Sequence, residues 1–158
     1  MEQLIDLLKT IPEYAALLEA VSKQQSAAVT GIGQINRSHI IAGLHRHTEH
    51  PLVLICQDDM AAKRLQEELK AFLGENAPIL PSRELTLYDT AVVSRSWEQK
   101  RLRQLYDLGR GCTPIQIMTW DSLSQRTMPA DVLRKAAFTL ECGKEYNMDS
   151  LLELLTGA

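Results

Sequence analysis

The stretch Ala-Val-Thr-Gly-Ile-Gly-Gln-Ile occupies residues 28–35, where an apolar run meets two glycines and a helical pattern follows. A phosphate-binding loop needs this order of strand, glycines and helix. We therefore predict a short buried strand over Ala27–Thr30, with Gly31 and Gly33 leading into a helix. A tight turn is the simpler interpretation of a glycine pair, and this stretch by itself does not exclude it.

The predicted loop lacks the side chains that bind nucleotides. A working loop has Lys after its last glycine, which reaches the β- and γ-phosphates, and then Ser or Thr, which holds magnesium. Gln34 and Ile35 occupy these positions. Gln is neutral, and Ile has no oxygen for a metal. The chain therefore carries a degenerate phosphate loop. Its members are Thr30, Gly31, Gly33, Gln34 and Ile35.

The composition is that of a globular protein, with 45% hydrophobic and 23% charged residues. A formal net charge of −3 disfavours a strongly basic nucleic-acid module. The cysteines Cys56, Cys112 and Cys142 have no Cys-x-x-Cys spacing, which favours reduced thiols over disulfides or zinc. No basic region precedes an apolar N-terminal stretch, and no apolar run could span a bilayer. We expect a cytoplasmic protein without membrane contact and without a metal or cofactor.

Hydrophobic periodicity predicts helices alternating with strands through most of the chain. Leu52–Cys56 is continuously apolar, as expected for a central parallel strand covered on both faces. Further strands are predicted at Ile79–Leu80, Ile115–Met118 and Ala136–Cys142, and helical spacing connects them. This alternation predicts an α/β fold, with a parallel sheet flanked by helices.

The predicted domain organisation has three parts. Residues 1–25 form N-terminal helices that pack on the domain, and residues 26–130 form the degenerate P-loop-like α/β subdomain. Residues 131–158 begin a second subdomain, because the strand–helix rhythm restarts after Pro129. The apolar helix at the end needs a packing partner, so we expect the chain to be part of a longer protein.

Two helices carry polar residues that could have a function. The histidines of the helix after the glycines are His39, His45, His47 and His50. His47 and His50 are three residues apart, but no acidic or cysteine partner has matching spacing, which favours a solvated face over a metal site. The helix from Arg95 to Arg110 carries Lys100, Arg101 and Arg103. These three side chains could contact phosphates weakly, although the wet side of an amphipathic helix is the simpler interpretation. Trp97 and Trp120 are predicted to be packing residues.

Three pieces of the chain support a family resemblance. They are Thr30–Gln34 with the strand Pro51–Ile55, the helix Met60–Phe72, and Glu84–Asp89 followed by Arg101, Leu102 and Leu105. Together they resemble the N-terminal, UvrB-like region of the bacterial transcription-repair coupling factors, the Mfd family. The resemblance covers about residues 26–158. Thr86 and Leu87 stand where the family's Glu-x-Leu-Pro-Tyr-Asp segment has Leu and Pro. UvrB inserts a long hairpin after this segment, for which the chain has too few residues.

The resemblance implies a P-loop, RecA-like fold of the first UvrB domain type. It implies a non-catalytic module that recruits UvrA in transcription-coupled nucleotide excision repair and helps to hold the full-length protein inactive. In the family, the ATP-dependent DNA translocase motor lies in other domains, which also contact RNA polymerase and DNA. The UvrA surface lies mostly in the second subdomain, mostly beyond Ala158. Two alternatives remain: a nucleotide-binding enzyme with an atypical loop, and a small DNA-binding domain that uses the Arg95–Arg110 helix.

Overall fold

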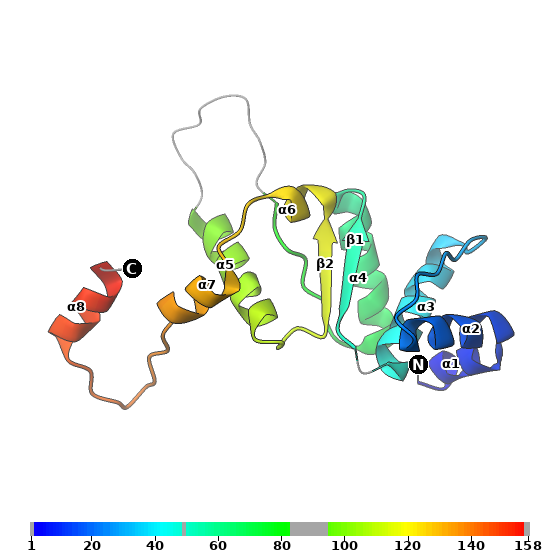
Figure 1. Ribbon diagram of the computed structural model, residues 1–158, viewed down its shortest axis with the longest axis horizontal. Helices are drawn as coiled ribbons and strands as arrows, with labels where there is room; N and C mark the ends of the chain where they lie inside the picture. The colour runs from blue at the N-terminus through cyan, green and yellow to red at the C-terminus, as the bar shows by residue number, and fades with distance from the viewer. Residues whose placement is uncertain (1, 49, 83–94, 157–158) are drawn as a thin grey trace, which may run out of the picture. The chain divides into compact units, whose positions relative to one another are not determined.

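The computed structural model describes residues 2–48, 50–82 and 95–156 of the chain (Figure 1). By contact density these residues belong to two compact units, Met1–Gln125 and Arg126–Ala158. The elements of the first unit are α1 (Glu2–Asp6), the 3-10 turn η1 (Leu7–Thr10), α2 (Pro12–Ser22), α3 (Gln34–His47), β1 (Leu52–Cys56), α4 (Asp59–Leu73), α5 (Arg95–Gly109), β2 (Ile115–Thr119) and α6 (Trp120–Ser124). The second unit contains α7 (Ala130–Ala136) and α8 (Met148–Thr156).

The first unit is a mixed structure in which helices flank a small parallel sheet. Strands β1 and β2 pair in parallel, with Leu52 opposite Ile115 and Cys56 opposite Thr119. A single bridge from Ile79 to Ile117 extends the sheet beyond β2. The predicted strands Leu52–Cys56 and Ile115–Met118 are confirmed, and the predicted strand at Ile79–Leu80 is reduced to this bridge.

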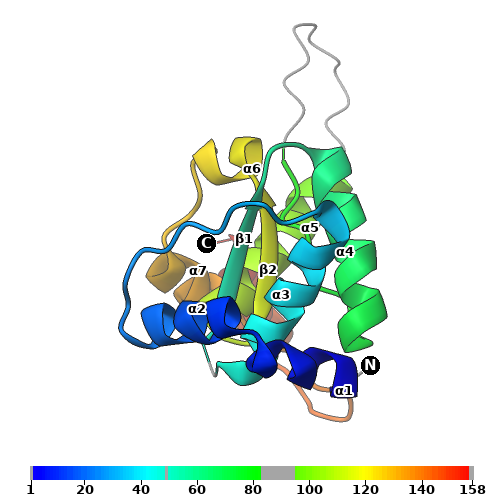
Figure 2. The ribbon, with the colours of Figure 1, turned by 90° about the vertical axis from the view of Figure 1, so that its right-hand side faces the viewer.

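Helices cover the two faces of the sheet unequally. Figures 1 and 2 show α3 and α4 on one face and α5 on the other. The core lies under α3 and α4, where Leu52, Leu54 and Cys56 pack with buried Leu69 and Ile117. The other side chains of β1, Val53 and Ile55, are 53% and 54% exposed. The prediction that this strand is covered on both faces is therefore wrong for the described part of the chain.

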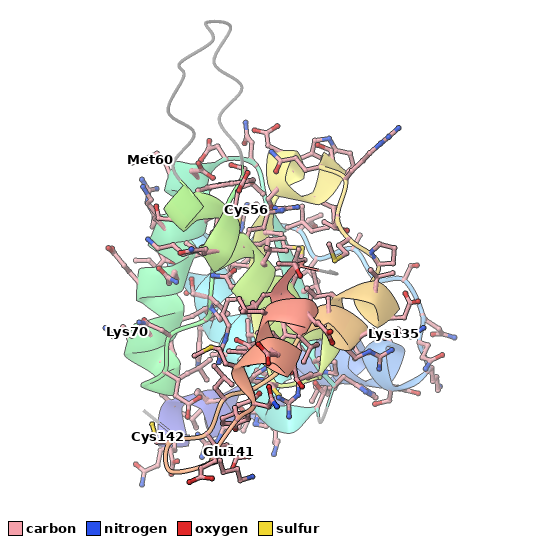
Figure 3. All side chains as sticks on the ribbon, turned by 90° about the vertical axis from the view of Figure 1, so that its left-hand side faces the viewer. Cys56, Met60, Lys70, Lys135, Glu141 and Cys142 are labelled. Atoms are coloured by element: carbon pink, nitrogen blue, oxygen red, sulfur yellow. The ribbon has the colours of Figure 1, made fainter. Side chains whose placement is uncertain are left out.

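Local sequence signals set the ends of α4. The Asp58 side chain accepts a hydrogen bond of 2.7 Å from the Ala61 N–H, as expected of an N-cap. Gly74 ends the helix with φ 76°, a left-handed conformation that glycine adopts without a steric penalty. Figure 3 labels Met60 and Lys70 near the two ends of this helix, with Cys56 close to its start.

Two predicted strands do not form. Residues 25–30 have no regular structure and are exposed, so Ala27–Thr30 does not precede the glycines as a strand. Residues 137–147 also form no strand, because α7 already contains Ala136 and irregular chain follows it. A short apolar run becomes a strand only beside another strand, and neither run has one.

The N-terminal helices pack on α3 at a glycine. A Cβ added at Gly43 would lie 2.5 Å from Leu8 Cδ1 and 2.7 Å from Tyr14 Oη. The Tyr14 hydroxyl lies 2.9 Å from His47 Nδ1, and His47 Nε2 lies 3.3 Å from Asp6 Oδ1. His39 Nε2 also lies 3.0 Å from the Leu4 carbonyl oxygen. The predicted solvated histidine face is therefore wrong for His39 and His47, which contact the N-terminal segment.

In the second unit, α8 begins with a side-chain cap. Asn147 Oδ1 accepts hydrogen bonds from the backbone N–H groups of Asp149 and Ser150, at 2.9 and 3.3 Å. An Asn side chain at an N-cap satisfies backbone N–H groups that have no partner within the helix. Among the described residues, no helix is both long and apolar enough to cross a membrane.

Candidate functional site

The glycine loop keeps half of the context that a phosphate loop needs. Gly31 has φ 75°, which favours glycine, and Gly33 is the N-cap residue of α3. The chain enters the loop from an exposed irregular segment and leaves it as a helix. The helical half of the prediction is therefore correct, and the strand half is wrong.

The side chains at the start of α3 lack the ammonium and hydroxyl groups of a working P-loop. Gln34 is the first helical residue, and its Oε1 accepts a hydrogen bond of 3.2 Å from Arg64 Nη1 of α4. Ile35 is 71% exposed and offers no oxygen. Arg64 borders the same hollow as Gly33, Gln34 and Ile35, so it is a cation near the place where a P-loop has lysine. Thr30 remains on the exposed segment before the loop.

The start of α3 has features that attract anions, and Gln34 and Ile35 supply neither a hydroxyl nor a carboxylate oxygen. The free N–H groups at a helix N-terminus carry partial positive charge, and Arg64 adds to it. Within the described ranges, no group of three His, Cys, Asp or Glu side chains is placed to hold a metal ion. Glu68, an acidic side chain beside the loop, already accepts a hydrogen bond from the Ser38 hydroxyl.

The basic residues of α5 lie in different environments. Lys100 is exposed, and Arg103 forms a surface ion pair of 3.0 Å with Asp107. Arg101 is only 6% exposed, and its guanidinium donates to the carbonyl oxygens of Pro81 and Ser122 at 2.6 and 3.0 Å. Burial lowers the pKa of Arg101 from its ordinary value. The predicted nucleic-acid contact of Lys100 and Arg103 stays a prediction, and Arg101 is instead committed to protein carbonyls.

Arg101 joins three parts of the first unit, a role that the sequence analysis missed. Its guanidinium lies 6.0 Å from the Trp97 ring, and Trp97 Nε1 donates to the Ser82 carbonyl oxygen at 2.6 Å. The signal was present, because Arg101, Leu105 and Leu108 recur at helical spacing on one stripe of α5. An arginine on an apolar stripe can mark a buried contact.

Trp120 is 65% exposed at the start of α6, so the prediction that it is a packing residue is wrong for the described chain. The segment Glu84–Asp89, which carries part of the family resemblance, lies outside the described residues.

Cys56 is the last residue of β1. Burial, and to a lesser extent the charge of Asp58, raises the pKa of the Cys56 thiol. The thiol is therefore a poor nucleophile.

Comparison with known proteins points to one kind of relative. The chain is similar to a transcription-repair-coupling factor of Myxococcus xanthus, with 28% identity over 150 residues, which are 90% of this chain. It is also similar to a transcription-repair-coupling factor of Escherichia coli strain K12, with 27% identity over 119 residues, which are 75% of this chain. These matches support a relation to such factors without showing which of their regions the chain corresponds to.

The chain spans only 12% and 10% of the length of these two relatives. No family model matches the chain, and no solved structure matches it. The parallel sheet flanked by helices is therefore observed, whereas a specific RecA-like fold is a matter for proposal.

Proposed function

We propose that the chain is a non-catalytic, UvrB-like module of a transcription-repair coupling factor. In this proposal it acts in transcription-coupled nucleotide excision repair, in the cytoplasm, as a scaffold that recruits UvrA and helps to hold the full-length protein inactive. Residues 1–25 are packing helices, residues 26–130 are the degenerate P-loop-like subdomain, and residues 131–158 begin the UvrA-binding subdomain. The similarity to two coupling factors supports this proposal.

The chemistry at the start of α3 is the observation that carries the non-catalytic part. A triphosphate brings several negative charges, and an absent loop lysine removes a charge-assisted contact of about 1.5–3 kcal/mol. Gln34 already accepts a hydrogen bond from Arg64, and Ile35 cannot bind magnesium. These features favour a module that has kept the loop but does not hydrolyse nucleotides.

Calorimetry with MgATP tests this part directly. We expect no measurable binding at millimolar ATP and no release of phosphate, because both loop ligands are absent. A dissociation constant in the micromolar range would overturn the non-catalytic proposal and would favour the atypical nucleotide-binding enzyme.

A rescue variant adds a stricter test. Gln34→Lys combined with Ile35→Thr restores both missing side chains, yet we expect no turnover, since magnesium-activated hydrolysis also needs acidic residues around the metal. Gln34→Lys alone serves as the control for added charge. Phosphate release by the double variant above that control would reveal an acidic site that the proposal does not contain.

Titration of UvrA onto the immobilised chain tests recruitment. Because residues 131–158 only begin the UvrA-binding subdomain in this proposal, we expect a weak complex with a dissociation constant of about 10–100 μM, or roughly −7 to −5 kcal/mol. Absence of binding at about 1 mM would overturn the recruitment part and would leave the calorimetric result unaffected. Duplex DNA affinity that falls steeply with salt would instead favour the DNA-binding alternative.

A further inference from the structure

One edge of the sheet in the first unit carries unpaired backbone groups. The Leu52 N–H donates to the Pro114 carbonyl oxygen at 2.8 Å. The backbone N–H and C=O groups of Leu52, Leu54 and Cys56 therefore point toward β2. Alternate residues of a strand face opposite neighbours, and the N–H and C=O groups of Val53 and Ile55 therefore point away from β2. Among the described residues no strand pairs with this side of β1, because the Ile79 bridge lies beyond β2.

A groove runs along this free edge. Its volume is about 510 Å³, and it is bounded by residues 53–57 of β1 and by side chains of α3 and α4, among them Ile41 and Leu65. A second hollow beside α3 is lined by aliphatic side chains that include Leu17 and Ile40. Arg37 and Ile41 line both spaces, so Arg37 stands where the two meet.

Arg37 is the one cationic side chain among the residues that line this groove. Arg37 is exposed, and its guanidinium forms no hydrogen bond or ion pair with any residue that the structure describes. Glu68, the acidic residue that lines the groove, accepts a hydrogen bond from the Ser38 hydroxyl. An occupant that pairs with Arg37 must therefore bring its own carboxylate.

We propose that the groove binds an extended aliphatic polypeptide segment that carries one carboxylate. The segment adds as a strand to β1, exchanges main-chain hydrogen bonds with Val53 and Ile55, and pairs its carboxylate with Arg37. A small anion could not use the strand edge. A second copy of the chain would bring its own α3 into the space, because α3 lines the groove in each copy. Ser26–Thr30, the irregular segment before α3, contains no acid and cannot supply this carboxylate.

A matched pair of peptides tests the proposal without reference to UvrA or ATP. The probes are the acetylated, amidated hexapeptide Thr-Val-Val-Asp-Val-Thr and its twin with Asn in place of Asp. Amide hydrogen exchange is followed by NMR at millimolar peptide. We expect the Asp peptide to slow exchange at Val53 and Ile55 severalfold, with no change at Leu54, which already bonds to β2.

The variants separate the two contacts. In the wild type, the Asp peptide should bind about threefold to tenfold more tightly than the Asn peptide. Arg37→Gln should remove this difference. Val53→Pro removes an N–H that points out of the sheet, so it should abolish peptide binding and leave the circular dichroism unchanged. The Arg37 comparison stands even where the proline variant unfolds.

Three results would overturn the proposal. One is equal affinity for the two peptides in the wild type, and another is no binding of either peptide at several millimolar. The third is slow exchange at Val53 and Ile55 in the free chain, which would mean that the edge is already filled. Sedimentation would then assign the filling to Ser26–Thr30 in a monomer or to a second copy in a dimer.

Discussion

Strands β1 and β2 lie side by side, have five residues each and are mostly aliphatic, yet their surroundings differ. All five residues of β2 are buried, whereas β1 alternates between partly buried and exposed positions. Strand β2 lies between β1 and the Ile79 bridge, and α6 follows it directly. In the described chain, β1 has a neighbour on one side only. Hydropathy therefore marks a strand but does not say whether the strand has one neighbour or two.

The sharpest test of this difference compares two isoleucines in neighbouring strands. Ile117 is completely buried in β2, so Ile117→Ala should lower the free energy of unfolding by about 2–5 kcal/mol through lost burial and a cavity. Ile55→Ala in β1 should cost less than about 1.5 kcal/mol, since that side chain is already half in solvent. Urea unfolding measures both changes, and equal losses would mean that β1 is covered in solution.

A second test concerns the buried contacts of Arg101 in α5. Arg101→Gln should lower the free energy of unfolding by about 2–4 kcal/mol, because it leaves the buried carbonyls of Pro81 and Ser122 without their charged donor. Arg103→Gln is the matched control, and its exposed pair with Asp107 should cost under about 1 kcal/mol. Chemical denaturation of both variants decides the point. Similar small losses would show that the Arg101 contacts are not formed.

A smaller effect is expected where the N-terminal helices meet α3. Gly43→Ala should lower the free energy of unfolding by about 1–2 kcal/mol, because the new methyl group collides with Leu8 and Tyr14. The better helix propensity of Ala offsets part of this cost. Gly33→Ala meets no atom closer than 3.9 Å, so it lacks this collision and should cost under about 1 kcal/mol, from the poorer N-cap preference of Ala. If thermal unfolding ranks the two variants the other way, the N-terminal helices do not pack here.

The smallest effect concerns the ionisation of one tyrosine. Burial raises the pKa of Tyr14 from 10.0 to about 12. Because the folded pKa lies above the unfolded one, this stabilisation is complete below pH 10 and is lost as the pH rises through 12. Tyrosinate absorbance of the wild type minus that of Tyr14→Phe should therefore titrate near pH 12. A difference titration centred near pH 10 would show that Tyr14 is solvated and that the N-terminal helices are loose.

The elements that the sequence determined by itself have local causes. The Asp58 cap, the Gly74 stop and the Asn147 cap each act through backbone groups within a few residues, so they were predictable. The missing Lys and Ser or Thr after Gly33 are also sequence facts, and they limit the loop chemistry in any fold.

Tertiary structure decided the features that depend on distant partners. The hydropathy of Ala27–Thr30 predicts a strand, but none forms. A strand needs a neighbouring strand, and hydropathy does not show whether one is present. Arg101 reads as a surface cation but is buried, because two carbonyl groups from other segments satisfy its guanidinium. The bare edge of β1 arises in the same way, since backbone pairing between strands is a long-range event that local propensity cannot specify.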